Sequence, residues 1–137
     1  MNFGEQEIRS LNALSAVSQV EAKDCLIGEK TISFVVNEGQ MGRAIGKNGV
    51  HIKKLEETFN KRIEIVEFRS APDAFLAGAF PQIRFGNFEI QQNGENKKVL
   101  IARPDTENRR KLLAATGKFR RMREFLSRLF DIVEVKI

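Results

Sequence analysis

The residues best suited to bind a ligand lie between Gly42 and Leu55, where three glycines and four Lys or Arg side chains occupy fourteen positions. Ile52, Leu55 and Phe59 follow at the spacing of one helix face, so the sequence predicts a helix that begins just after the glycines. Glycines at a helix start leave its first backbone N–H groups open to a ligand. Because Lys47 adds a cation at the same place, we expect the ligand to be a phosphate group.

Two common glycine-rich phosphate motifs do not fit this stretch. A P-loop containing Gly46-Lys47 requires Gly at position 41 and Ser or Thr at position 48, where the chain has Met41 and Asn48. A dinucleotide-binding fingerprint requires a further glycine at the position of Ala44. We therefore expect the phosphate to belong to a ligand other than a P-loop nucleotide or a dinucleotide cofactor.

The segment from Ile45 to Ile52 has the pattern Ile-Gly-x-x-Gly-x-x-Ile. It resembles the KH domain, in which a GxxG loop joins two helices and holds the backbone of about four single-stranded nucleotides. The resemblance implies that the loop and Lys47 bind phosphates and that the two isoleucines line an apolar groove for bases. The RNA-binding residues implied in this half are Arg43, Ile45, Gly46, Lys47, Asn48, Gly49, Ile52, Lys53 and Lys54. The competing interpretation is a helical hairpin turn whose lysines are merely solvated.

The composition favours a small binding protein with a polyanionic partner. The 137 residues carry a net charge of +5, and 42% are hydrophobic, which is enough to build a core. All 11 aromatic residues are Phe, most of which we expect in the core. Cys25 is the single cysteine and is predicted to be a buried, inert thiol. No apolar run approaches the ~20 residues of a membrane span, so we expect a cytoplasmic protein with no membrane partner.

The first half is expected to fold in the order α-β-β-α-(GxxG)-α-β. Helical periodicity comes first, and two β-patterned runs follow with Gly28-Glu29-Lys30 between them. The predicted elements are a helix at 5–18, strands at 23–27 and 31–36, a helical turn at 40–45, a helix that ends near residue 60 and a strand at 62–68. This order is that of the type II KH fold.

The second half repeats this order, with a hairpin signal at Asn93-Gly94 and a helix N-cap within Pro104-Asp105-Thr106. Its predicted elements are a helix at 73–80, strands at 85–91 and 98–103, a helix from 105 to about 115, a second helix after Gly117-Lys118-Phe119-Arg120 and a strand at 132–137. The resemblance implies an α+β protein of two tandem type II KH domains, residues 1–69 and 70–137. Each would have a three-stranded mixed sheet covered by helices on one face.

The second GxxG loop is expected to be degenerate, because Phe119 and Arg120 align with Asn48 and Gly49. A side chain at the second glycine position hinders close approach of a nucleotide. Residues 103–128 nevertheless hold nine Lys or Arg against three acidic residues. We therefore expect charge to support RNA contacts at Gly117, Lys118, Arg120 and Arg121, the alternative being a solvated helix face. Phe119 is expected to be an apolar contact at the domain interface rather than a base-stacking ring.

The tandem layout resembles the family of archaeal NusA-like transcription termination/antitermination factors. The specific elements are the loop from Gly42 to Gly49, the strand Arg62–Phe68 and the degenerate second loop. The resemblance implies binding of single-stranded nascent RNA during elongation, with an effect on pausing or termination. The RNA polymerase elongation complex is a candidate partner. The bacterial members' additional polymerase-binding and S1 domains have no counterpart in the 137 residues.

Two other functions compete with this one. Type II KH domains also occur in ribosomal and ribosome-assembly proteins, so a ribosomal RNA partner is the alternative. Catalysis has no motif behind it, because His51 and Cys25 are the only His and Cys and cannot form a zinc set or a two-histidine acid–base pair. We expect His51 to be exposed, and we expect no enzyme activity, no metal, no cofactor and no small-molecule substrate.

Overall fold

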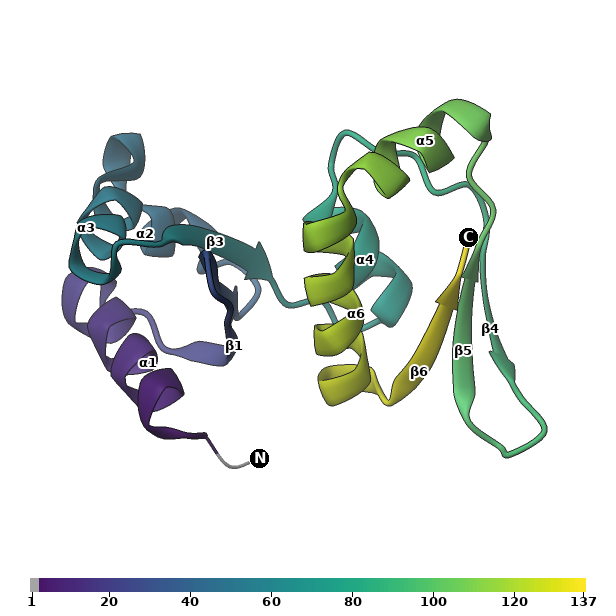
Figure 1. The fold of residues 1–137 in the computed structure, drawn as a ribbon, viewed down its shortest axis with the longest axis horizontal. Helices are drawn as coiled ribbons and strands as arrows, with labels where there is room; N and C mark the ends of the chain where they lie inside the picture. The colour runs from purple at the N-terminus through teal and green to yellow at the C-terminus, as the bar shows by residue number, and fades with distance from the viewer. Residues whose placement is uncertain (1–2) are drawn as a thin grey trace. The chain divides into compact units, whose positions relative to one another are not determined.

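The computed structural model describes residues 3–137, which form two compact units that divide between Arg69 and Ser70 (Figure 1). Both units are α+β, and both contain one three-stranded sheet. Within residues 3–137, every helix is too short or too polar to cross a membrane.

The first unit follows the predicted order of elements. Its strands pair in the order β1-β2-β3, with β1 antiparallel to β2 and β2 parallel to β3. The elements are α1 (Glu5–Ser18), β1 (Ala22–Ile27), β2 (Thr31–Val36), α2 (Met41–Ile45), the short 3₁₀ turn η1 (Lys47–Gly49), α3 (Val50–Phe59) and β3 (Arg62–Glu67).

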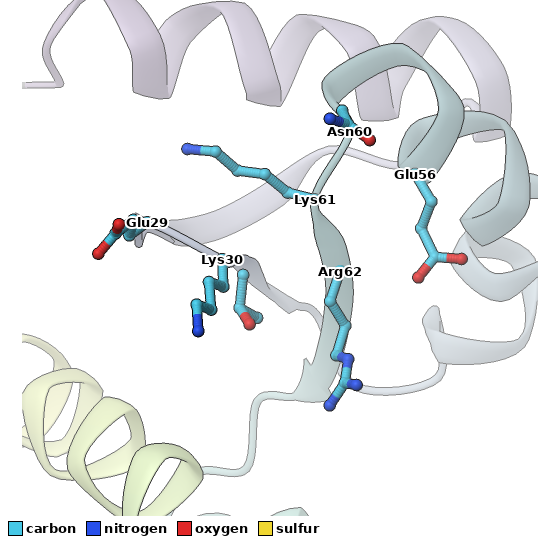
Figure 2. Close-up of a pocket in the computed structure, with 7 residues that line it drawn as sticks. Glu29, Lys30, Glu56, Asn60, Lys61 and Arg62 are labelled. Carbon is cyan, nitrogen blue, oxygen red and sulfur yellow. The ribbon is translucent and has the colours of Figure 1, made fainter.

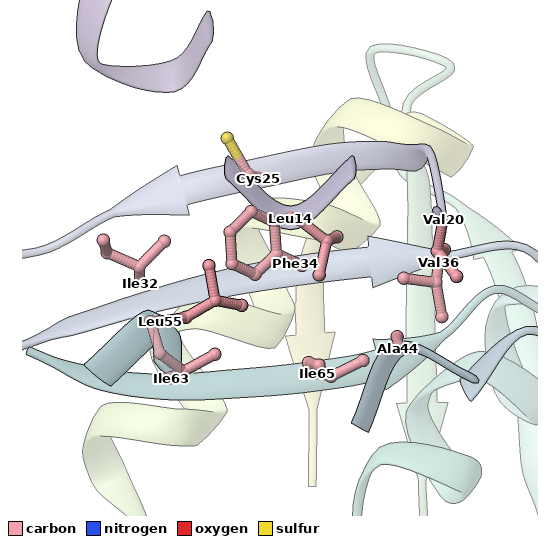
Figure 3. Close-up of a cluster of buried hydrophobic side chains, with 10 residues drawn as sticks. All are labelled: Leu14, Val20, Cys25, Ile32, Phe34, Val36, Ala44, Leu55, Ile63 and Ile65. Atoms are coloured by element: carbon pink, nitrogen blue, oxygen red, sulfur yellow. The ribbon is translucent and has the colours of Figure 1, made fainter. Parts of the chain in front are cut away.

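The core of the first unit lies between the helices and one face of this sheet (Figure 3). Leu14 of α1 and Leu55 of α3 pack with Phe34 of β2, and all three side chains are fully buried. Truncating a buried leucine of this kind to alanine typically costs about 2–5 kcal/mol. Cys25 belongs to the same cluster, which confirms the prediction of a buried thiol.

The second unit has the same order of elements and the same strand pairing. The sheet order is β4-β5-β6, with one antiparallel and one parallel pair. The elements are α4 (Pro72–Ala79), β4 (Phe88–Gln92), β5 (Lys98–Ala102), α5 (Thr106–Ala114), α6 (Thr116–Phe130) and β6 (Ile132–Lys136). Phe75, Leu100 and Phe125 are among its fully buried side chains.

Strand β4 begins at Phe88, three residues later than predicted. Gly86 has φ +71°, a left-handed conformation that interrupts the extended chain. The N–H of Arg103 donates to the carbonyls of Phe85 and Asn87, at 3.0 and 3.2 Å, so the backbone around Gly86 folds against Arg103 instead of pairing as a regular ladder. The following hairpin closes through Asn93, whose Oδ1 accepts from the N–H groups of Glu95 and Lys97.

The second unit does not contain the loop expected at Gly117–Arg120. These residues form the first turns of α6, and a single non-helical residue, Ala115, separates α5 from α6. Gly117 does not adopt a positive φ, and Phe119 N–H donates to the Ala115 carbonyl at 2.9 Å. Phe119 is 8% exposed, so burial of its ring favours a continuous helix over a loop here.

Gly86→Ala should destabilise the second unit. A Cβ at this position would overlap the Arg103 carbonyl oxygen, and alanine disfavours φ +71°. Backbone strain alone costs about 1–3 kcal/mol. Denaturant unfolding should therefore show a lower midpoint. Gly94→Ala is the matched control, because a Cβ there meets nothing within 4 Å. Equal stability of the two variants would contradict the assigned conformation of Gly86.

The stability contributed by the α5 N-cap should depend on pH. The backbone N–H of Asn108 and then its side-chain amide, each 2.9 Å from Asp105 Oδ1, lower the pKa of the Asp105 carboxyl. A folded-state pKa below the unfolded one stabilises the protein above the usual aspartate range, and this contribution is lost as pH falls through the folded pKa. Unfolding midpoints of wild type and Asp105→Asn should therefore differ at pH 7 and converge only when the pH falls below the lowered pKa of Asp105, which lies under the usual aspartate value of about 3.9. A constant difference would contradict this assignment.

Candidate nucleic-acid interface

The loop between α2 and α3 is a sharp reversal built on left-handed backbone conformations. Gly46 has φ +79°, Asn48 +57° and Gly49 +73°. Glycine adopts such angles without steric cost, and asparagine is the residue that tolerates them next best. The predicted GxxG turn is therefore present in the first unit, and both glycines occupy conformations that require glycine.

Three backbone hydrogen bonds hold this loop in place. The N–H of Gly46 donates to the Gly42 carbonyl, and the N–H of Gly49 donates to the Gly46 carbonyl, both at 3.0 Å. The N–H of Val50 donates to the Lys47 carbonyl. Helix α3 then begins directly after the loop, where the first N–H groups of a helix carry a partial positive charge. This geometry suits an anion.

Side chains around the loop strengthen the positive field. Residues 43–54 contain Arg43, Lys47, Lys53 and Lys54 and no acidic residue, and all four cations are exposed. Asn48 is exposed beside them. Ile45 and Ile52 pack against the core of the first unit while remaining partly accessible. The nine residues that the sequence analysis selected in this half therefore lie in the loop or in the helices on either side of it, and each is exposed or partly accessible.

His51 has a role in the loop that the sequence analysis did not identify. Its ring is half-buried rather than exposed, and its Nδ1 lies 2.8 Å from the Arg43 carbonyl oxygen. A carbonyl only accepts, so Nδ1 carries the proton and donates. The ring also covers Gly46, where a Cβ would lie 2.7 Å from Nδ1. The position of His51 could have predicted this contact, because a side chain in the first turn of a helix leans back over the preceding residues.

A second hollow lies at the opposite end of α3, and none of the predicted RNA-binding residues lines it (Figure 2). Its volume is about 600 Å³. The lining residues are Glu29, Lys30, Thr31, Glu56, Asn60, Lys61 and Arg62. Lys61 Nζ donates to the Gly28 carbonyl at 2.8 Å, which ties the β1–β2 turn to the start of β3. Mixed charges and this internal bond make the hollow less suited to a polyanion than the loop.

The residues selected in the second unit do not form one site. Lys118 Nζ lies 4.9 Å from the centroid of the Phe80 ring. Arg120 instead lines a hollow of about 330 Å³ between α6 and β6. Gly117 and Arg121 are half-buried within α6. Because Lys118 and Arg120 are two residues apart in a helix, their side chains leave α6 on different sides, whereas a GxxG loop was expected to place them in one site.

The predictions for Phe119 and for the basic residues of this unit have different outcomes. Burial of Phe119 rules out base stacking, and the Arg123 guanidinium lies 5.0 Å from its ring centroid. Among the predicted cations, Arg103, Lys111 and Arg128 form ion pairs with Glu89, Glu107 and Glu124 at 2.8, 3.7 and 3.3 Å.

Within residues 3–137, no group of three or more His, Cys, Asp or Glu could hold a metal ion.

Comparison with known proteins agrees with this geometry. Residues 7–71 match the KH domain family. "Probable transcription termination protein NusA" of Methanocaldococcus jannaschii is 27% identical over 133 residues, which cover 96% of this chain and 72% of that protein. The protein of the same name from Halococcus morrhuae is 25% identical over 138 residues, covering 100% of this chain and 98% of the relative. The crystal structure of APE1850 superposes with a TM-score of 0.86 at 28% identity, covering 98% of this chain and 99% of that one.

His51→Ala should loosen the loop without unfolding the first unit. The variant removes the hydrogen bond to Arg43 and the ring that covers Gly46, at an expected cost of about 1 kcal/mol. Amide hydrogen exchange at Lys47, Asn48 and Gly49 should become faster. Lys54→Ala, an exposed change on the same helix, is the control. Unchanged loop exchange in His51→Ala would show that the ring does not hold the loop.

Proposed function

Because residues 7–71 match the KH domain family and the chain is similar over nearly its whole length to archaeal proteins named "Probable transcription termination protein NusA", we propose that this protein binds single-stranded RNA as a transcription factor. The observation that carries the proposal is the loop at Gly46–Gly49, where left-handed backbone, a helix start and exposed cations coincide.

The first unit would hold RNA mainly through its phosphates. Backbone N–H groups that the loop's own three hydrogen bonds do not use would bind one phosphate, and Lys47 would bind beside them. Lys53 and Lys54 extend the positive track along the exposed side of α3. Binding that depends on phosphates tolerates many sequences and weakens with salt, with a slope of about −0.7 per phosphate contact on a single strand.

Bases would lie against the accessible parts of Ile45 and Ile52. These side chains offer apolar contact but no hydrogen-bonding groups that distinguish one base from another. Sequence preference in this unit is therefore expected to be weak. Binding energy comes from the backbone of the RNA, and the apolar surface adds contact area.

The second unit would contribute charge rather than a backbone clamp. Arg120 is exposed beside the hollow between α6 and β6, whereas Arg121 is half-buried and does not line it. We assign any RNA contact of this unit to that side of α6, because Gly117 and Lys118 lie in a helix that gives no loop for close approach. A guanidinium binds phosphate without needing such a loop.

The biological setting proposed is nascent RNA emerging from transcription, with an effect on pausing or termination. The names of the archaeal relatives favour this setting over the ribosomal alternative. An RNA polymerase elongation complex is the corresponding candidate partner. Co-purification with polymerase rather than with small-subunit ribosomal RNA would separate the two settings.

Replacing Lys47 and Asn48 together by Asp should abolish RNA binding while leaving the fold intact, because both side chains are exposed. Anisotropy of a labelled single-stranded RNA should show at least a tenfold loss of affinity, and the salt slope should fall. Single-stranded DNA and duplex RNA serve as comparison ligands.

Asn96→Asp with Lys97→Asp is the matched control. It replaces the same two residue types and changes the charge by the same amount in an exposed turn of the second unit. This control should bind RNA with little loss. An equal loss in both variants would mean that net charge alone drives binding, and unchanged affinity in the loop variant would refute the loop as the site.

A further inference from the structure

The second unit contains a pocket that the RNA-binding proposal does not use. Its volume is about 420 Å³. It lies between the turn that follows α4 and the junction of α5 with α6. The lining residues are Phe80, Pro81, Gln82, Ile83, Lys111, Ala115 and Lys118.

One side of this pocket is apolar and held in a fixed shape. Phe80, Pro81 and Ile83 form a turn closed by a 3.0 Å hydrogen bond from the Ile83 N–H to the Phe80 carbonyl. The next residue, Arg84, donates its N–H to Asn108 Oδ1 of α5 at 2.8 Å. The turn is thus attached to α5, so the pocket exists before any ligand arrives.

The other side of the pocket is cationic. Lys111 and Lys118 are its only charged residues, and no acidic residue lines it. Lys118 Nζ stays close to the Phe80 ring, which holds the ammonium group at the pocket edge. Lys111 Nζ lies 3.7 Å from Glu107, a long, solvent-exposed ion pair of the kind that contributes little and exchanges readily. Both ammonium groups are therefore available to an incoming carboxylate.

The lining favours an apolar side chain over a nucleotide. Phe80 is only 5% exposed and Lys118 lies over its ring, so the pocket has no free aromatic face for a base to stack on. Its backbone also lacks the positive-φ glycines that allow phosphate contact in the first unit. A pocket of this size with two cations at its edge is complementary to an apolar group flanked by negative charge.

We propose that this pocket binds a short segment of a partner protein in which an apolar side chain is flanked by Asp or Glu residues. The apolar side chain inserts against the accessible parts of Pro81 and Ile83, and the flanking carboxylates pair with Lys111 and Lys118. The two units then bind different ligands at corresponding places in their folds. Where the first unit has Lys47 in an open loop, the second has Lys118 in a helix beside an apolar pocket.

The test is a methyl NMR titration of the full chain with a capped peptide, Asp-Glu-Phe-Asp-Glu. Resonances of Ile83 and Ala115 should shift on binding. One comparison peptide replaces Phe by Ser, and another replaces the acids by Asn and Gln. Both should bind at least tenfold more weakly. Lys118→Glu should also weaken binding at least tenfold, whereas Arg109→Glu, an exposed charge reversal on α5 outside the pocket, should not.

Lys111→Glu serves as a second variant if Lys118→Glu fails to fold. The proposal predicts that either folded variant recovers affinity for a peptide in which lysines replace the acids. It is overturned if the Ile83 and Ala115 resonances do not respond to millimolar peptide, or if the uncharged peptide binds equally well. It is also overturned if single-stranded RNA shifts these resonances and Lys118→Glu abolishes that effect. RNA binding at Gly46–Gly49 is measured separately, so either proposal can fail alone.

Discussion

Parallel pairing of two strands is the constraint on which each unit depends. β2 and β3 run in the same direction, as do β5 and β6, so the chain must return along the whole sheet before the second strand can pair. The returning segment consists of helices that cover one face of the sheet. In each unit this segment contains two helices with a break between them. The loop at Gly46–Gly49 is such a break, held rigidly because both flanking helices are anchored in the core.

The two units use this break in different ways. In the first unit, glycine and asparagine hold the backbone open, and the chemistry comes from N–H groups and nearby cations. In the second, one residue separates α5 from α6, and the chemistry comes from side chains alone. One topology therefore gives a glycine loop in the first unit and a pocket beside a nearly continuous pair of helices in the second. Only the loop depends on backbone conformation, which explains why glycine matters so much at its two ends.

Most of the fold could be predicted from the sequence because helical spacing, β-patterned runs and turn residues identify the elements locally. The spacing of Ile52, Leu55 and Phe59 predicts the face of α3 that packs on the core, and the structure confirms it, whereas β2 is buried on both faces. The loop could be predicted equally well, because two glycines just before a helical pattern indicate a tight turn. The predictions failed where long-range contacts decided the outcome. Aligning Gly117 with Gly46 suggested a loop, but burial of Phe119 extends the helix. The late start of β4 depends on Arg103, seventeen residues beyond Gly86, which no local pattern reveals.

The contact between His51 and Gly46 also limits how this chain can change over evolutionary time. Alanine at position 46 would collide with the imidazole, while a smaller residue at position 51 would leave the Arg43 carbonyl without its donor. Neither position can drift freely while the other keeps its present residue. A smaller residue at position 51 would not by itself free position 46, because the positive φ of Gly46 still disfavours a side chain there. Substitutions at positions 46 and 51 are therefore expected to occur together. The sequence of this loop should diverge more slowly than the solvent exposure of the neighbouring residues suggests.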